Sequence, residues 1–172
     1  HLVFSTLHTN DAPGAMTRLV DMGIEPYLVA SSLEMVLAQR LVRLICTHCH
    51  EAFTPDDAQA MRTQFGDDMP EVLYRGRGCR ECQGSGYRGR TGIFELLVVS
   101  EAIRAMILER ASTGEIRKQA VREGMRSLRD DGWRLVRSGK TTLAEVLRAT
   151  KDERFNGNGA APAADSAPPP TT

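Results

Sequence analysis

The sequence predicts an α/β fold with a cysteine-rich middle segment and an all-helical C-terminal part. Three observations support this prediction. An apolar run at the start of the chain is followed by apolar residues at helical spacing. Two Cys-x-x-Cys pairs occupy the middle of the chain, and helix-capping residues recur from Ser100 onward. We therefore expect three units, residues 1–44, 45–92 and 93–150, followed by a tail of residues 151–172.

The overall composition is typical of a globular protein. Of the 172 residues, 41% are apolar and 26% are charged. Lysine and arginine together balance aspartate and glutamate at 22 each, so the formal net charge is zero. A neutral chain is not expected to coat nucleic acid as its main role. No apolar run approaches the roughly eighteen residues that a membrane-spanning helix needs.

The N-terminal segment is predicted to form one strand and two helices. Residues 1–7, HLVFSTL, have the apolar character of a buried strand. Asn10 to Pro13 is predicted to start a helix, which Gly23 ends. Pro26 is predicted to open a longer helix that runs directly into the first cysteine pair. One side of that second helix would carry Leu33, Val36, Leu37, Arg40, Leu41 and Leu44.

The middle segment is predicted to contain a short helix and a strand. Thr54 and Pro55 are predicted as the cap and first turn of a helix that reaches about residue 66. A glycine- and arginine-rich stretch then runs from Arg75 to Gly92. Its end, GIFELLVV, is rich in Ile, Phe, Leu and Val and is predicted as a strand.

Capping signals predict a C-terminal unit of three or four helices. Two Ser/Thr–Glu pairs have capping-box spacing, and two glycines stand where helices would end. The residues at these cap positions are Ser100, Ser112, Glu115, Gly124, Gly139, Thr142 and Glu145. The tail of residues 151–172 lacks apolar periodicity and is rich in Ala, Pro, Gly and Asn, so we predict that it is disordered.

The four cysteines fall into two pairs with metal-site spacing. Each pair places two thiolates on a tight turn, and 29 residues separate the pairs. Two such turns can close a tetrahedron of sulfur around Zn²⁺, which leaves no open position for water and indicates a structural site. Disulfides or inert thiols are the alternatives, and His48 or His50 could replace one cysteine. The predicted ligands are Cys46, Cys49, Cys79 and Cys82.

Two local motifs point to other functions but do not meet the full requirements. CRECQGSG, residues 79–86, matches one repeat of the DnaJ-type chaperone zinc domains, which use four such repeats. RSGKTT, residues 137–142, contains the end of a phosphate-binding loop. The full loop needs a preceding strand and a glycine at the position of Arg134, whereas the pattern there is helical. We therefore expect Gly139 to end one helix and Thr142 to cap the next.

Five stretches, in order, resemble the secretion ATPases of type II secretion and type IV pilus assembly. They are HLVFSTLHTNDA (1–12), TRLVDMGIEP (17–26), QRLVRLICTHC (39–49), YRGRTGIFELL (87–97) and GMRSLRDDGWRLVRSGKTTLAEVLRAT (124–150). The resemblance implies a hexameric motor that uses ATP and Mg²⁺. Residues 1–44 would end its RecA-like P-loop NTPase core, residues 45–92 would form a zinc-binding subdomain, and residues 93–150 would add a return strand and a helical domain. The paired cysteines favour the secretion and assembly branch over the pilus-retraction motors, which typically lack them.

The resemblance also implies a longer protein. A working ATPase of this family needs a phosphate loop, an acidic box and a Walker B segment, and none is present in this sequence. We therefore expect the C-terminal part of a longer chain, inactive in ATP hydrolysis by itself. The implied partners are further copies in a homo-hexamer and an inner-membrane platform protein, with a cytoplasmic location peripheral to that membrane.

The resemblance assigns nucleotide roles to residues near the start of the chain. His8 is similar to the second histidine of the family's His box, and His1 to its first. Ligands of open α/β sheets bind beyond the carboxyl ends of strands, so His8 and Thr9 would lie near a γ-phosphate, where His8 could sense it or orient water. Arg18 could contact a phosphate or a neighbouring subunit, as could Arg40. The alternatives are a histidine bonded to local backbone and solvated or salt-bridged arginines.

Other functions remain open on the sequence alone. The chain could be a non-catalytic zinc-ribbon binding module, or a regulatory ATPase-like protein without a working phosphate loop. Only Tyr74 and Tyr87 could stack with bases near a local basic patch, so nucleic acid is not the expected partner. The patch could instead contact a membrane protein or phospholipid headgroups, or form a solvated loop. Its members are Arg75, Arg77, Arg80, Arg88 and Arg90.

Overall fold

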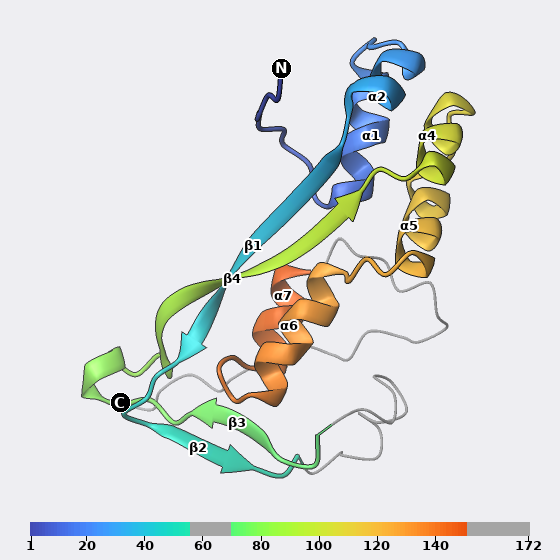
Figure 1. Ribbon diagram of the computed structural model, residues 1–172. Helices are drawn as coiled ribbons and strands as arrows, with labels where there is room; N and C mark the ends of the chain where they lie inside the picture. Colours follow the sequence, from blue (N-terminus) through green and yellow to red (C-terminus); the bar gives the residue numbers. More distant parts are fainter. Residues whose placement is uncertain (56–69, 151–172) are drawn as a thin grey trace.

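A long antiparallel ribbon of two strands, β1 and β4, runs through the middle of the molecule (Figure 1). The structure, a computed structural model, describes residues 1–55 and 70–150. β1 spans Met35–Ile45 and β4 spans Tyr87–Val98, so the whole cysteine-rich segment lies between them in the sequence. Their register shifts once, near the end of β1, just before the first cysteine pair. The ribbon confirms the predicted GIFELLVV strand and the mixed α/β character.

A second, shorter ribbon holds the cysteine-rich segment. It pairs β2 (His50–Phe53) with β3 (Leu73–Gly76) and lies beyond the lower end of the long ribbon in Figure 1. A single 3₁₀ turn, η1 (Arg80–Cys82), follows β3 and leads back to β4. The short ribbon is therefore an insertion between the two strands of the long ribbon.

The helices that the structure describes pack against the long ribbon in two groups. The first group covers its upper end in Figure 1 and forms a core with Leu97 and Val99. Its members are α1 (Ala12–Asp21), α2 (Pro26–Ser32), α4 (Glu101–Leu108) and α5 (Thr113–Arg122). None of the described helices has the length and apolar character that crossing a membrane requires.

The second group consists of α6 (Leu128–Arg137) and α7 (Leu143–Ala149). Leu128 and Leu135 of α6 pack on Val42 and Ile93 of the long ribbon. Further side chains of both helices pack on β3. The predicted C-terminal helices are thus present as α4–α7, but they pack as two pairs against different neighbours.

Residues 1–7 do not form the predicted strand. Residues 1–9 are irregular, and the apolar side chains at positions 2–4 are largely exposed. Within the described part of the chain, no strand pairs with them. A strand without a partner can neither satisfy its backbone N–H and C=O groups in a ladder nor bury one face. Apolar composition alone is therefore insufficient to form a strand.

The helix that Pro26 opens is shorter than predicted. It ends at Ser32, and the residues that were expected to continue it form β1. The stretch MVLAQRLVRLI places apolar residues at spacings that fit either a helix or a strand. Antiparallel pairing with β4 along nearly its whole length selects the strand. The first cysteine pair accordingly follows a strand rather than a helix.

The predicted helix caps are confirmed, except that Glu145 does not complete a capping box with Thr142, because its carboxylate binds Arg43 and Arg148 instead. Each capping hydroxyl accepts the backbone N–H three residues further on, as seen for Ser100, Ser112 and Thr142. Three glycines take positive φ angles just after helices, namely Gly23, Gly124 and Gly139. Two further predictions, the helix from Thr54 toward residue 66 beyond Pro55 and the disordered tail of residues 151–172, lie outside the described residues.

Candidate functional site

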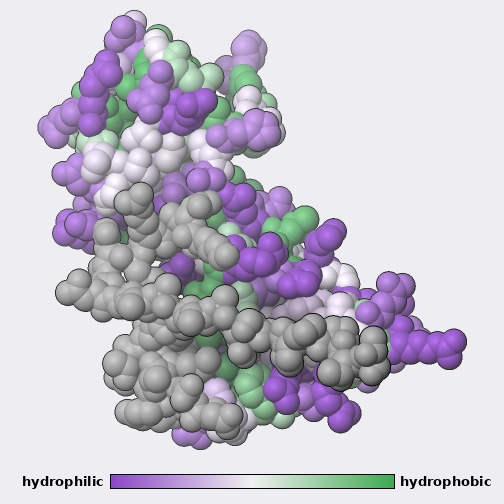
Figure 2. Space-filling model, turned by 180° about the vertical axis from the view of Figure 1, so that it is seen from behind, coloured by the Kyte–Doolittle hydropathy of each residue, from purple (hydrophilic) through white to green (hydrophobic). Residues whose placement is uncertain are grey.

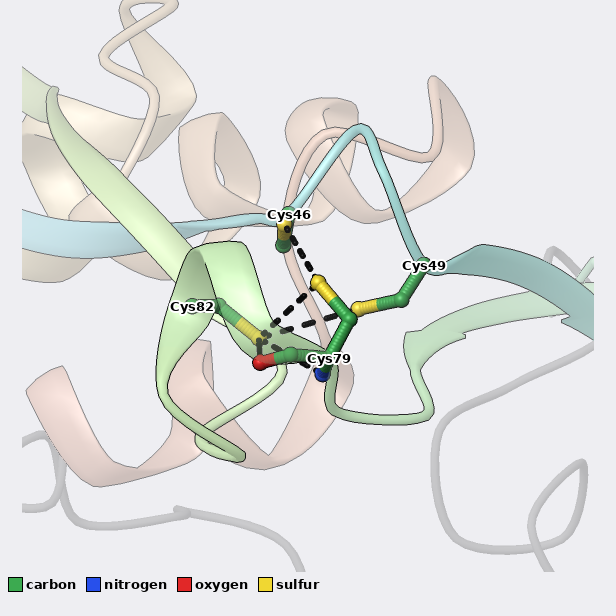
Figure 3. A group of neighbouring side chains, drawn as sticks. All are labelled: Cys46, Cys49, Cys79 and Cys82. Carbon is green, nitrogen blue, oxygen red and sulfur yellow. Dashed lines mark hydrogen bonds between the residues drawn. The ribbon is translucent and has the colours of Figure 1, made fainter.

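The four cysteines converge where the two ribbons meet. Cys46 directly follows β1 and Cys49 directly precedes β2, while Cys79 directly precedes η1 and Cys82 is its last residue. Their Sγ atoms all lie within 4.8 Å of one another, and the side chains point toward a common centre (Figure 3). All four are free cysteines, and three of them are buried. The structure therefore brings together every thiol that the sequence predicted as a ligand.

The spacing of the sulfur atoms fits a tetrahedral metal ion. A tetrahedron with Zn–S bonds of about 2.3 Å has edges of about 3.8 Å. The Sγ atom of Cys79 lies 3.9 Å from that of Cys46 and 3.7 Å from that of Cys82. The Sγ atoms of Cys49 and Cys82 are 3.8 Å apart. Four sulfur atoms at these separations can hold a metal ion.

Glycines shape the second cysteine turn, as the sequence predicted. Gly78, Gly84 and Gly86 have φ angles of +89°, +78° and +74°. A Cβ atom at Gly78 would lie 2.6 Å from the carbonyl oxygen of Gly84, so a larger residue would clash with backbone. In this turn the backbone N–H groups of Cys79 and Gly86 donate to Sγ of Cys82, at 3.1 and 3.3 Å. Such donors orient a thiolate toward a metal.

The same contacts change the acidity of the thiols. Burial by itself raises the pKa of Cys82, but the N–H groups of Cys79 and Gly86, together with the thiols of Cys79 and Cys49, outweigh burial and lower the pKa to about 6. Burial raises the pKa of Cys49, and the neighbouring thiols raise it further, against the opposing effect of the Gly78 backbone. Metals bind the deprotonated form of a thiol, which the two N–H donors to Cys82 favour.

Neither nearby histidine lies within the sulfur cluster. His48 is exposed. The Nε2 atom of His50 lies 3.0 Å from the carbonyl oxygen of Gly139, and its ring stacks on Tyr74 with centroids 4.8 Å apart. His50 therefore joins β2 to the loop between α6 and α7, a contact that the sequence did not indicate.

A buried carboxylate, Glu145 of α7, binds β1 just ahead of the first cysteine. It accepts hydrogen bonds from the backbone N–H of Arg43 at 3.1 Å and from the guanidinium groups of Arg43 and Arg148 at 2.8 and 2.7 Å. Burial alone raises the pKa of Glu145, but the hydrogen bonds from Arg148 and Arg43 outweigh it and lower the pKa to about 2. The guanidinium of Arg43 also lies 4.1 Å from the ring centroid of Tyr87.

The RSGKTT stretch connects two helices, as predicted, and binds the end of β1. It follows α6 rather than a strand. The N–H of Ile45 donates to the carbonyl oxygen of Lys140 at 2.9 Å. The hydroxyl of Thr141 donates to the carbonyl oxygen of Arg43 at 2.7 Å. The hydroxyls of Thr142 and Tyr87 are 2.8 Å apart. Its polar groups are thus engaged with the strands that carry the cysteines.

The predicted nucleotide-contacting residues lie on the irregular N-terminal segment and on α1. His1 and His8 are exposed, and the hydroxyl of Thr9 donates to the carbonyl oxygen of Asp11 at 3.1 Å. Arg18 is exposed on α1. Within the described residues, no hydrogen bond or ion pair joins these four side chains. Arg40 lies on β1, where its guanidinium donates to the side chain of Asn10 at 3.0 Å.

A charged cluster that sequence reasoning missed surrounds the start of α1. Glu95 of β4 is fully buried, and its carboxylate accepts the N–H of Ala12 at 2.8 Å. The guanidinium of Arg117, on α5, lies 3.3 Å from Glu95 and 2.6 Å from Asp11. Burial raises the pKa of Glu95, against the opposing effects of the Ala12 N–H and Arg117.

A signal for Glu95 was present in the sequence. Alternate side chains of a strand share a face, so position 95 shares its face with Ile93, Leu97 and Val99 in GIFELLVV. Those three side chains are buried. An acidic residue in an otherwise apolar row needs a buried partner, which is what Arg117 supplies.

Most of the arginines in the basic patch pair with acidic side chains. Arg75 and Arg77 lie 2.8 and 3.1 Å from Glu51, and Arg88 lies 3.0 Å from Glu81. Exposed pairs of this kind contribute little to stability. Hydrophilic side chains gather over the part of the molecule that projects to the right in Figure 2. The remaining exposed members of the patch are Arg80 and Arg90.

Comparison with known proteins relates this chain to bacterial secretion and pilus proteins. It is 52% identical over 153 residues to type II secretion system protein E of Pseudomonas aeruginosa, a match that covers 89% of this chain and 30% of that protein. It is 51% identical to type II secretion system ATPase E of Vibrio cholerae, a match that covers 88% of this chain and 30% of that protein. It is 43% identical to the type IV pilus assembly ATPase PilB of Myxococcus xanthus, a match that covers 90% of this chain and 28% of PilB. The chain thus spans about 30% of the length of these relatives.

A solved structure and a family model agree with these relatives. The crystal structure of the pilus retraction motor PilT with bound ADP has a similar fold, with a TM-score of 0.54 at 22% identity. That match covers 89% of this chain and 33% of PilT. The model of the family described as type II/IV secretion system protein matches residues 1–148. With its mixed α/β fold and its converging cysteines, the chain belongs to the type II/IV secretion system protein family.

Proposed function

We propose that this chain is the C-terminal part of a hexameric ATPase that powers type II protein secretion or type IV pilus assembly. One observation carries this function: the match to the type II/IV secretion system family extends over residues 1–148 and includes all four converging cysteines. The relatives that name an activity are ATPases of secretion or pilus assembly.

An exposed apolar face of the long ribbon supports a larger protein. Six large apolar side chains, 43–61% exposed, line one face of β1 and β4. The face is larger than the scattered apolar residues that monomers usually expose, and the apolar residues 2–4 are also exposed. We infer that the remainder of the ATPase core covers it. The six side chains are Met35, Leu37, Leu41, Phe94, Leu96 and Val98.

In the proposed enzyme the N-terminal segment contributes to the nucleotide site. ATP and Mg²⁺ supply the reactive phosphate and its charge neutralisation, and phosphoryl transfer needs a positioned water and groups that stabilise charge. His8, with an imidazole that can donate or accept a proton, would orient water or sense the γ-phosphate. Thr9, His1 and Arg18 would add contacts to the phosphates or to a neighbouring subunit.

The cysteine cluster would hold one structural Zn²⁺. Four sulfur ligands leave no position for water or substrate, so the ion would stabilise the fold rather than take part in hydrolysis. Thiolates of the turn between β1 and β2 and of the segment at η1 would then be joined at one point. The two ribbons would thereby become one rigid support.

The proposed partners follow from the same assignment. Further copies would form a homo-hexamer, and an inner-membrane platform protein would receive the movement at the cytoplasmic face of that membrane. Arg80 and Arg90 are exposed on the zinc-binding subdomain and are the cations available for that protein or for phospholipid headgroups.

A test of the proposed function uses the complete coding region. We expect a G-x-x-x-x-G-K-[ST] loop and an acidic Walker B segment upstream of His1, and Mg²⁺-dependent ATP hydrolysis by the full-length protein. An intact protein without these motifs and without turnover would instead be a regulatory ATPase-like protein. Salt-dependent binding to single-stranded nucleic acid would favour a zinc-ribbon binding module.

A further inference from the structure

The segment that carries His8 is fixed to the body of the protein at one turn, residues 10–11. Residues 1–9 are irregular and mostly exposed. At Asn10 this changes, because the guanidinium of Arg40 on β1 donates to its side-chain oxygen at 3.0 Å and to its carbonyl oxygen at 3.4 Å. The position of His8 therefore depends on how firmly the next two residues are held.

The second contact of this turn comes from the C-terminal helices. Asp11 caps α1, since its Oδ1 accepts the N–H of Gly14 at 2.7 Å. Its other oxygen, Oδ2, lies 2.6 Å from the guanidinium of Arg117 on α5. A cap needs only the first of these contacts. The second links the turn to a helix about a hundred residues further along the chain.

Glu95 holds Arg117 in place and also binds the start of α1. The carboxylate is fully buried, with Oε1 accepting the N–H of Ala12 at 2.8 Å and Oε2 lying 3.3 Å from Arg117. Asp11, Ala12, Glu95 and Arg117 thus form a closed circuit around one helix start. A single guanidinium with separate nitrogens on two carboxylates fixes direction as well as distance.

The charges of this circuit fix a geometry as well as contributing to stability. Replacing a buried ion pair with apolar residues is often neutral or stabilising, so its retained value can lie in fixing one geometry. The geometry fixed here is that of the turn that follows His8 and Thr9. A shift of α5 would be passed to this turn through packed, charged contacts.

We propose that Arg117 is a positioning residue that, through Asp11 and Glu95, sets the turn presenting His8 to the nucleotide and so couples ATP hydrolysis to the α4–α5 helix pair. This inference rests on the proposed ATPase function. Arg117 acts through other residues and touches no nucleotide itself.

The effect on the turn is measured on this chain by amide hydrogen exchange. In Arg117→Lys the charge that balances Glu95 remains, but one ammonium cannot occupy both guanidinium positions. We expect exchange at Ala12 and Gly14 to become at least about 10-fold faster, while the neighbouring exposed variant Lys118→Ala leaves it unchanged. Asp11→Asn is the second variant, because asparagine keeps the cap but loses the charged contact with Arg117. Unchanged exchange in both variants would overturn the inference.

The effect on hydrolysis is measured in the full-length protein. We expect Arg117→Lys and Asp11→Asn to lower kcat about 10- to 100-fold with little change in KM for ATP. In a His8→Ala background the same substitutions should cause no further loss, because both act through His8. If the losses multiply instead, Arg117 acts elsewhere and the inference fails while the ATPase function stands. If the unmodified protein shows no turnover, the proposed function itself fails.

Discussion

Glu145 and Glu95 are buried carboxylates whose charges are balanced by arginines. Glu145 binds Arg43 and Arg148 beside the cysteine cluster, and Glu95 binds Arg117 beside the start of α1. Neither was predicted as a buried charge, because Glu145 was expected only as a helix-cap residue and the acidic position in the apolar row of β4 was not recognised as needing a partner. Burial decides their importance, because a buried charge without its partner is strongly destabilising.

The pH dependence of stability should carry a contribution from Glu145. Its pKa falls from a usual value of 4.5 to about 2 in the folded chain, so the folded state binds fewer protons than the unfolded state between these values. The stabilisation is fully present above about pH 5 and is lost as the pH falls toward 2. We expect Glu145→Gln to lower the free energy of unfolding at pH 7 by about 1–2 kcal/mol, a value reduced by solvent screening of the half-exposed arginines. The variant should therefore unfold at a lower denaturant concentration.

The measurement for this prediction is chemical denaturation of both proteins at several pH values. The difference between them should shrink as the pH falls from about 4.5 toward 2. Glu109→Gln, an exposed residue of the same type, is the control and should match the unmodified chain. A difference that stays constant across the acid range would contradict the assignment to the carboxylate charge.

His8 is the residue on which the proposed chemistry depends most directly. We expect His8→Ala in the full-length protein to lower ATP turnover about 100-fold, the lower end of the range for a positioned proton-transfer or orienting group. Because the side chain is exposed, its removal should not change the unfolding midpoint. Steady-state kinetics and circular dichroism measure the two effects. Unchanged turnover would make His8 an ordinary histidine next to a helix start.

At the scale of elements, close packing of α6 on α7 depends on one glycine. A Cβ atom at Gly132 would lie 2.6 Å from a methyl carbon of Val146. Alanine in place of glycine within a helix normally gains about 1 kcal/mol, but overpacking of this kind costs about 1–3 kcal/mol. We therefore expect Gly132→Ala to give no net stabilisation and to destabilise the chain by up to about 2 kcal/mol in thermal unfolding.

A matched control separates packing from helix propensity. At Gly114, in the first turn of α5, the nearest atom to an added Cβ would be 4.0 Å away. Gly114→Ala should therefore be neutral or stabilising, by up to about 1 kcal/mol. Equal effects of the two substitutions would show that contact between α6 and α7 is looser than described.

Elements also show where sequence patterns were insufficient. β1 was predicted as part of a helix, because its apolar residues fit both periodicities. The partner that selects a strand, β4, lies more than forty residues away along the chain. Caps were predicted well for the opposite reason, since Ser112 and Glu115 need only each other and the local backbone.

At the scale of the whole molecule, the cysteine cluster joins the two ribbons and, through β1, the α6–α7 pair. We expect one Zn²⁺ per chain, bound through four thiolates. Removing it with a chelator under reducing conditions should lower the unfolding midpoint by about 10 °C or more, since structural zinc contributes folding free energy directly. Metal analysis measures the zinc content, and thermal unfolding measures the midpoint.

His48→Ala is the control and should keep the full zinc content. A chain with disulfides and no zinc would refute the assignment.

The sequence by itself determined the features that depend on neighbours a few residues apart. These are the helix caps, the glycine turns around the second cysteine pair, and the identity of the four candidate ligands, whose spacing limits them to two tight turns. Five ordered motifs also determined the family resemblance, which the comparisons bear out.

Only the tertiary structure decided the features that depend on partners far along the chain. Strand pairing selected β1 over a longer helix and left residues 1–7 without a partner among the described residues. Burial gave Glu95 and Glu145 their importance, through arginines 22 and 102 positions away. The physical reason is that hydrogen-bond ladders and buried charges are satisfied by whichever groups the fold brings close, and sequence spacing does not specify those groups.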